Sequence, residues 1–248
     1  LLEEYFAQYE FTAKYMFSCS DCDGYSMQYV LNQADESEKK MWDGLKLGYT
    51  ETPGRPFLWE AIKKYYSNGA VDDIVVASPG ELSFMTMNIL MEGVGNPHAV
   101  VVSPAYQSLY QVLESLGCEL SYWEAEEREG EWIFDISKLR SLVRPETRLI
   151  VINFPHNPTG ATLSREGLEE IVEIGRSCGA YIYSDEMYRD LIIDEKITSV
   201  PPIYELYEKG ISLWGMAKSF GLAGARIGWI ASRDRWLIEQ LLVFKPYL

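Results

Sequence analysis

Apolar and polar positions alternate in two patterns from residue 74 onward. Short apolar runs rich in β-branched residues, such as HAVVVS at 98–103, are typical of buried strands. Longer segments with apolar residues at helical spacing, such as LEEIVEIGRSCG at 168–179, lie between these runs and predict helices. We predict strands at 74–78, 98–103, 118–125, 148–154, 180–184, 211–217 and 226–232. We predict helices at 37–46, 57–67, 82–93, 108–117, 136–143 and 168–179, and a further helix at the end of the chain.

The alternation of strands and helices indicates the fold class. It favours a mostly parallel sheet that is covered by helices on both faces. We therefore predict an α/β fold with three layers, α/β/α, around a mostly parallel central sheet. Functional side chains of such sheets gather at the carboxyl ends of the strands. Five loops follow predicted strands and are expected at that edge: SPGEL at 78–82, SPAYQ at 103–107, NFPHNPTG at 153–160, SDEMY at 184–188 and GMAKSFGLAGARIG at 215–228.

Charge and composition narrow the choice of partner. The 248 residues carry a formal net charge of −15, which argues against nucleic acid or an anionic membrane as the partner. No apolar run reaches the length of a membrane span, and the acidic, aromatic first residues do not resemble a signal peptide. The sequence has no initiator Met and ends within a helix-like segment, so we expect it to be cut at both ends.

The cysteines raise the question of a metal or redox site. Cys19 and Cys22 form a CxxC pair, but a zinc site needs a second pair or two histidines at ligand spacing. The only histidines, His98 and His156, lie far apart in the sequence. We therefore predict free thiols in a reducing cytoplasm, and no metal.

Three polar residues follow predicted strands and carry two interpretations each. Lys218 stands among small residues, so its amine could form a Schiff base with a carbonyl compound, although an isolated loop lysine is usually solvated. Asp185 ends an apolar run, where it either meets a cation or caps the next turn. Asn157, in HNPTG, either donates its amide to a ligand or makes a simple turn before proline.

Five further residues are weak signals individually. Tyr106 could stack on a flat ligand or pack in the ordinary way. Gly80 begins a predicted helix, where backbone N–H groups can reach a phosphate. Arg226 could bind the same phosphate or form a surface ion pair. Tyr188 and Tyr49 could donate hydroxyl hydrogen bonds, but tyrosines are common in this chain.

Each residue alone favours its ordinary structural interpretation, whereas the set indicates one ligand. A stacking ring, an acid, an amide donor, a lysine, a glycine at a helix start and an arginine suit an aromatic aldehyde. That aldehyde carries a phosphate and a ring nitrogen that needs a counter-charge. This is the chemistry of pyridoxal phosphate.

The motifs HNPTG, SDEMY and AKSFGLAGARIG, in this order, resemble those of the class I/II aminotransferases. These are the aspartate-aminotransferase-like enzymes of fold type I, which use pyridoxal phosphate. The resemblance extends from about residue 48 to residue 230. It implies a cofactor-binding large domain at 48–248, preceded at 1–47 by an N-terminal arm and part of a small domain. It also implies that most of the small C-terminal domain is missing from this chain.

The resemblance implies a role for each residue around the cofactor ring. Lys218 would form the internal aldimine and then act as the base in the 1,3-proton shift, with its pKa lowered by the positive cofactor. Asp185 would pair with the ring nitrogen and keep it protonated. Asn157 and Tyr188 would hydrogen-bond the ring oxygen. Tyr106 would stack on the ring face.

The resemblance also assigns the phosphate. The backbone at Gly80 and Glu81 and the side chain of Arg226 would bind it. Tyr49 would reach the phosphate of a neighbouring subunit, which implies a homodimer. His156 and Pro158 would shape their loop without reacting.

Two positions depart from the family pattern. Many relatives carry Ser or Thr three residues before the lysine, where this chain has Gly215, so that phosphate contact is either absent or replaced by a serine such as Ser212 or Ser219. Glu81 stands where a small or hydroxylated residue is usual, and its carboxylate would repel a phosphate unless it points away.

The resemblance implies transamination between an amino acid and a 2-oxo acid. A β-lyase, a cyclising synthase or a decarboxylase of the same fold is the alternative, because the fate of the substrate carbanion depends on groups outside these motifs. A non-catalytic regulatory module that binds the cofactor is disfavoured by the acidic charge. The substrate-carboxylate arginine belongs to the missing domain, so substrate choice stays open.

Overall fold

A single mixed sheet forms the centre of the computed structural model, which describes residues 2–191 and 200–248. Its strand order is β1-β9-β8-β7-β6-β2-β3. β9 runs antiparallel to both of its neighbours, and the other adjacent pairs are parallel. The strands of this sheet are β1 Ile74–Ala77, β2 His98–Ser103, β3 Glu119–Glu124, β6 Thr147–Asn153, β7 Tyr181–Asp185, β8 Gly210–Gly215 and β9 Gly228–Ser232.

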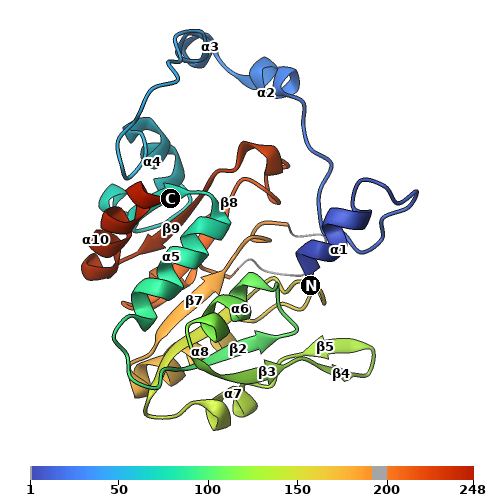
Figure 1. The fold of residues 1–248 in the computed structure, drawn as a ribbon, viewed down its shortest axis with the longest axis vertical. Coiled ribbons are helices and arrows are strands. Elements are labelled where there is room, and N and C mark those ends of the chain that lie inside the picture. The colour runs from blue at the N-terminus through green and yellow to red at the C-terminus, as the bar shows by residue number, and fades with distance from the viewer. Residues whose placement is uncertain (1, 192–199) are drawn as a thin grey trace.

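Helices cover both faces of the sheet (Figure 1). They are α4 Pro56–Lys63, α5 Pro79–Met91, α6 Ser108–Ser115, α7 Ile136–Leu142, α8 Arg165–Cys178, α9 Ile203–Leu206 and α10 Arg235–Phe244. One apolar cluster joins one face of the sheet to α5, α6 and α10, and a second joins the other face to α7, α8 and α9. Alternate residues of one strand serve the two faces: Val75 of β1 belongs to the first cluster, whereas Ile74 and Val76 pack with α4. These layers confirm the predicted three-layer α/β/α fold.

The strands are where the apolar runs predict them, and the differences lie at the surface. The helix predicted at 57–67 ends at Lys63. A hairpin of β4 Glu126–Arg128 and β5 Glu131–Ile133 was not predicted, because its two strands are only three residues long and contain no buried residue. The last predicted helix is present as α10.

The N-terminal part of the chain lies outside the layers. α1 Leu2–Tyr9 lies beside the loops at the end of the sheet, whereas α2 Met27–Gln33 and α3 Glu36–Asp43 lie along a segment that reaches away from it (Figure 1). These three helices contain no buried residue, and α1 and α2 were not predicted, although Leu2, Phe6 and Tyr9 of α1 stand at helical spacing. Within the described ranges, no helix combines the length and apolar character needed to cross a membrane.

Candidate active site

The carboxyl ends of five strands meet at one edge of the sheet. β2, β6, β7 and β8 are parallel, and β1 runs in the same direction because β9 is antiparallel to both β1 and β8. The loops after these strands line a cavity of about 340 Å³. Seven of the predicted site residues line it: Gly80, Tyr106, Asn157, Asp185, Tyr188, Lys218 and Arg226.

Lys218 lies just beyond the end of β8. Only 15% of its side chain is exposed, and its ammonium forms an ion pair with Asp21 of the N-terminal segment. Burial is the largest single influence and lowers the pKa of the Lys218 amine, but the hydrogen bond to Asp21 and the charge interactions with Tyr188, Asp21 and Cys19 together outweigh it, so the pKa lies above its usual value. The amine is therefore charged at neutral pH in this arrangement.

A buried polar network holds the Lys218 loop from behind. Glu186 and Arg189 form an ion pair at 2.9 Å with less than a tenth of each side chain exposed. The Arg189 guanidinium lies over the Trp214 ring at 3.7 Å from its centroid. Trp214 Nε1 donates to Ser219 Oγ at 3.1 Å, and Ser219 in turn donates to the Arg189 carbonyl. Residues on both sides of Lys218 are thus fixed to the β7 loop.

Asp185 ends β7 beside this network. Its Oδ1 accepts a hydrogen bond from the Met187 N–H at 3.0 Å. Burial raises the pKa of the Asp185 carboxyl to about 6, while the Met187 N–H acts in the opposite direction. A positively charged ring nitrogen placed here would restore the carboxylate, because an opposite charge favours the ionised form.

Asn153 is a positioning residue that the motifs did not identify. Its amide donates to the Asp185 carbonyl at 2.9 Å, and its Oδ1 accepts from the Asn157 N–H at 3.0 Å. The one side chain therefore sets the spacing between two cavity residues. A buried asparagine at the end of the apolar run LIVIN was the available signal, because a buried amide needs polar partners.

His156 ties the Asn157 loop to its neighbour. Its Nε2 lies 2.7 Å from the Pro104 carbonyl, which can only accept, so this nitrogen carries a proton. Its Nδ1 lies 2.7 Å from Thr159 Oγ1, whose hydroxyl can donate to it. Burial lowers the pKa of the His156 imidazole, so it is neutral at pH 7 and both ring nitrogens are occupied within the protein.

The other end of the cavity suits an anion. Gly80 is the second residue of α5, and a side chain built on it would meet nothing within 4 Å, so the helix N-terminus is open there. Arg226 is exposed at the cavity, and a guanidinium nitrogen of Arg226 lies 3.4 Å from Ser78 Oγ. A helix N-terminus and a guanidinium both favour negative charge.

The two departures from the family pattern have structural causes. Glu81 folds back so that its carboxylate accepts from the Ser78 N–H at 3.4 Å, and its side chain does not line the cavity. A Cβ on Gly215 would lie 3.0 Å from the Gly228 Cα and from the Ile227 carbonyl oxygen, so the close β8–β9 pairing disfavours Ser or Thr here.

The serines expected to replace the missing phosphate contact do not do so in this structure. Ser212 is fully buried and donates to Glu186 at 2.7 Å, and Ser219 is bound to Arg189. Neither hydroxyl lines the cavity, which favours the other alternative, that this phosphate contact is absent. Ser83 and Ser108 do line it.

The N-terminal segment supplies the remaining wall of the cavity, which no pattern in the sequence predicts. Residues Glu3, Phe6, Glu10, Cys19, Ser20 and Asp21 line it. Tyr106, with 41% of its surface exposed, donates its hydroxyl to Glu3, and Tyr188 donates to Ser20 Oγ at 2.9 Å.

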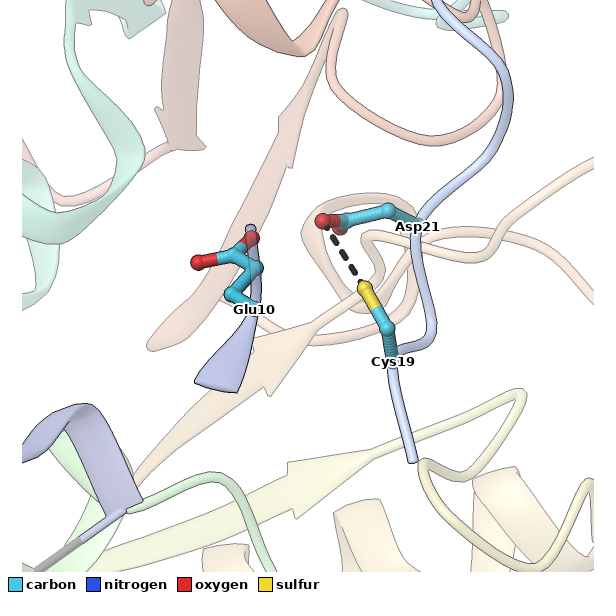
Figure 2. A group of neighbouring side chains, drawn as sticks. All are labelled: Glu10, Cys19 and Asp21. Carbon is cyan, nitrogen blue, oxygen red and sulfur yellow. Dashed lines mark hydrogen bonds between the residues drawn. The ribbon is translucent and has the colours of Figure 1, made fainter. Parts of the chain in front are cut away.

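Three residues of this segment lie close enough to share a metal ion. Figure 2 shows Glu10, Cys19 and Asp21, with the Cys19 thiol donating to Asp21 at 3.1 Å. Their ligand atoms lie within 4.8 Å of one another. Asp21 already binds the Lys218 ammonium, however, so a metal would have to displace an existing cation. All four cysteines are free thiols.

Tyr49 lies apart from the cavity. It is fully exposed on the segment between α3 and α4 and does not line the cavity. Its predicted contact with a neighbouring subunit therefore stays a prediction.

The residues of the cavity fit pyridoxal phosphate in three ways. The buried carboxylate of Asp185 is available to pair with the ring nitrogen. The open N-terminus of α5, with Arg226, suits the phosphate, and the amine of Lys218 lies in the same cavity. Asn157 and Tyr188 line that cavity and offer donors to a ring oxygen.

Comparison with known proteins agrees with this fit. The sequence profile of the family "Aminotransferase class I and II" matches residues 16–246. The aromatic-amino-acid aminotransferase 2 of Thermococcus litoralis is 34% identical over 120 residues, which cover 48% of this chain and 31% of that protein. The capreomycidine synthase of Streptomyces vinaceus is 32% identical over 153 residues, which cover 60% of this chain and 37% of that protein.

A solved structure matches nearly the whole chain. A PLP-dependent aminotransferase from Streptococcus suis superposes with a TM-score of 0.88 at 33% sequence identity, covering 99% of this chain and 65% of that one. The chain thus spans less than two thirds of the length of each of these three proteins.

Proposed function

This chain belongs to the class I and II aminotransferases, and from that premise we propose that the intact protein is a pyridoxal-phosphate-dependent aminotransferase. It moves an amino group between an amino acid and a 2-oxo acid. One observation carries the proposal: the amine of Lys218 shares a cavity at the strand ends with the buried carboxylate of Asp185 and the open N-terminus of α5.

Each residue around the cofactor ring has a separate role in this proposal. Bound pyridoxal phosphate supplies an aldehyde for amines and a ring that accepts electrons from the substrate carbon. The Asp185 carboxylate holds a proton on the ring nitrogen, and burial strengthens that interaction because water is excluded. Asn157 and Tyr188 donate hydrogen bonds to the ring oxygen. Tyr106 covers a face of the ring.

Lys218 has two tasks in this proposal. Its amine would hold the cofactor through the aldehyde carbon, and the same amine, when free, would accept and return the proton of the substrate Cα. At the other end of the cavity, Arg226 and the N–H groups at the start of α5, near Gly80 and Glu81, bind the phosphate.

The arrangement leaves a second candidate function, a cyclising synthase. The similarity to capreomycidine synthase, over 60% of this chain, favours a synthase over a β-lyase or a decarboxylase of the same fold. Transamination and cyclisation both begin with loss of the substrate Cα proton to a lysine, so residues such as Lys218 and Asp185 serve either. A β-lyase would share this first step.

Product analysis of the intact protein separates these functions. The protein loaded with pyridoxal phosphate is incubated with single amino acids, with and without 2-oxoglutarate as acceptor. An aminotransferase forms one oxo acid for each amino acid consumed and converts the cofactor to its amine form when the acceptor is omitted. Release of ammonia and pyruvate, or a cyclic product with the cofactor unchanged, would replace the proposal with the lyase or the synthase.

The assembly follows from the same proposal. We propose a homodimer in which Tyr49 of each subunit reaches the phosphate of the other, since Tyr49 is fully exposed and does not line the cavity. We also propose that the enzyme acts in the cytoplasm on an amino acid and a 2-oxo acid. The acidic net charge of the chain is compatible with this location.

A further inference from the structure

Several hydrogen bonds hold the N-terminal segment, residues 2–25, against the opening of the cavity. The Leu2 N–H donates to Gln107 Oε1 at 2.9 Å. At the far end of the segment, the Tyr25 N–H donates to the Gly221 carbonyl at 3.2 Å, three residues beyond Lys218. The Cys22 thiol lies 3.5 Å from the Lys218 carbonyl.

Between these points, the segment binds three of the side chains that the proposed function assigns to the cofactor. Glu3 accepts from Tyr106, Ser20 accepts from Tyr188, and Asp21 accepts from Lys218. The lysine contact differs from the other two because it joins opposite charges. It is also the contact that bears on the chemistry, since only a neutral amine can attack an aldehyde.

The surroundings of Lys218 make Asp21 the dominant partner. The charged or titratable groups that face its amine are Asp21, Cys19, Tyr188 and Asp185. Among these, only Asp21 is hydrogen-bonded to the ammonium within the described part of the chain. The Asp21 carboxyl has a pKa below its usual value, chiefly because of the hydrogen bond from Lys218, and the Lys218 pKa is raised. Both partners are therefore charged at neutral pH.

We propose that Asp21 is a positioning residue that holds the Lys218 amine protonated and turned toward the N-terminal segment until the cofactor enters. The proposal rests on the proposed function, in which Lys218 bonds to the cofactor. The carbon–nitrogen bond forms when the nitrogen lone pair attacks the aldehyde carbon. Of the three ammonium protons, two leave with the aldehyde oxygen as water and one stays on nitrogen, so the charge is conserved. The nitrogen must lose its first proton before it can attack, and the ion pair with Asp21 opposes that loss by stabilising the ammonium.

The test measures how fast the intact, cofactor-free protein bonds to pyridoxal phosphate between pH 6 and pH 9. The readout is the growth of the visible absorption band of the lysine-bound cofactor after mixing. We expect Asp21→Asn to bond about tenfold or more faster at pH 7 and to move the midpoint of the pH profile downward, because each unit by which the amine pKa falls gives about ten times more neutral amine.

Two variants serve as controls. Asp23→Asn removes the same charge from the same exposed segment, and Asp23 does not line the cavity, so this variant keeps the wild-type profile. Asp21→Glu keeps a carboxylate and restores most of the wild-type profile.

The outcomes separate the two proposals. If Asp21→Asn has the wild-type profile, or changes the rate by the same factor at every pH, Asp21 does not control the protonation of Lys218 and the inference is overturned. If the wild-type protein gives no such band, or Lys218→Ala gives the same band, the proposed function itself fails.

Discussion

The two walls of the cavity are built from opposite kinds of structure. The sheet wall stands on β6, β7 and β8, and buried groups such as Asn153, Glu186 and Arg189 fix its side chains. The N-terminal wall, with Ser20 and Asp21, is mostly exposed and is joined to the sheet wall by individual hydrogen bonds and one ion pair. In the proposed function the sheet wall would carry the chemistry, and its buried contacts should make it the more stable of the two walls, whereas the N-terminal wall would act on it through these few contacts.

The largest expected effect comes from the centre of the sheet wall. We expect Lys218→Ala to reduce turnover by at least 10²- to 10⁴-fold, about the factor that proton transfer by one positioned group contributes. Pyridoxal phosphate should still bind without a covalent bond, since Asp185 and the α5 N-terminus are unchanged. Steady-state kinetics and the visible spectrum check both statements. Retained turnover would show that the walls divide their roles differently.

The sheet wall should also depend on its buried ion pair for stability. Glu186→Ala leaves the Arg189 charge buried without its partner and removes the acceptor of the Ser212 hydroxyl, so we expect a loss of about 3–5 kcal/mol in the free energy of unfolding. Urea denaturation measures it. The matched control is Glu173→Ala, which breaks an exposed pair of the same i,i+3 spacing with Arg176 and should leave the midpoint nearly unchanged. Equal losses in the two variants would show that burial of the pair is unimportant.

The Asp185 carboxylate, which the proposed function requires, should lower the free energy of unfolding of the cofactor-free protein. Its folded pKa of about 6 lies above the usual value of 3.8, so the folded state binds the proton more tightly than the unfolded state. The stability of the cofactor-free protein should therefore fall as the pH rises from about 4 to 6. Asp185→Asn should remove this dependence and gain roughly 2 kcal/mol above pH 6.

The measurement for Asp185 is urea denaturation of the wild type and Asp185→Asn at pH 5 and pH 8. The same variant should lose affinity for the cofactor, because the ring nitrogen loses its counter-charge. A variant less stable than the wild type at pH 8 would show that the carboxylate is stabilised in ways that burial alone does not describe.

The smallest effect is expected in the N-terminal wall. Ser20→Ala removes the acceptor of the Tyr188 hydroxyl, but Ser20 is exposed, so the free energy of unfolding should change by less than about 0.5 kcal/mol. Thermal denaturation of the cofactor-free protein checks this. A loss comparable to that of Glu186→Ala would mean that the two walls form one cooperative unit.

The same contrast explains what could be predicted from the sequence. The sheet wall was predictable because its strands are continuous apolar runs, and polar residues such as Asp185 and Asn157 stand where each run ends. Parallel strands then bring those ends together. The positioning role of Asn153 was not predicted, because hydrogen bonds between two loops produce no periodic pattern in the sequence.

The N-terminal wall could not be predicted, because it buries nothing. α1 has no buried residue, and Asp21 meets Lys218 across 197 positions of sequence. Local motifs do not reveal such contacts. The motif also left open whether Ser212 replaces the phosphate-binding hydroxyl, because the burial of Ser212 beneath Glu186 depends on packing between strands, which the motif does not encode.

The central claim is that Lys218 is the residue that bonds to the cofactor. The most direct measurement is borohydride reduction of the intact protein loaded with pyridoxal phosphate, followed by digestion and peptide mass spectrometry. We predict one modified peptide, with the added mass on Lys218. Modification of another lysine in place of Lys218, or no modification at all, would contradict the claim.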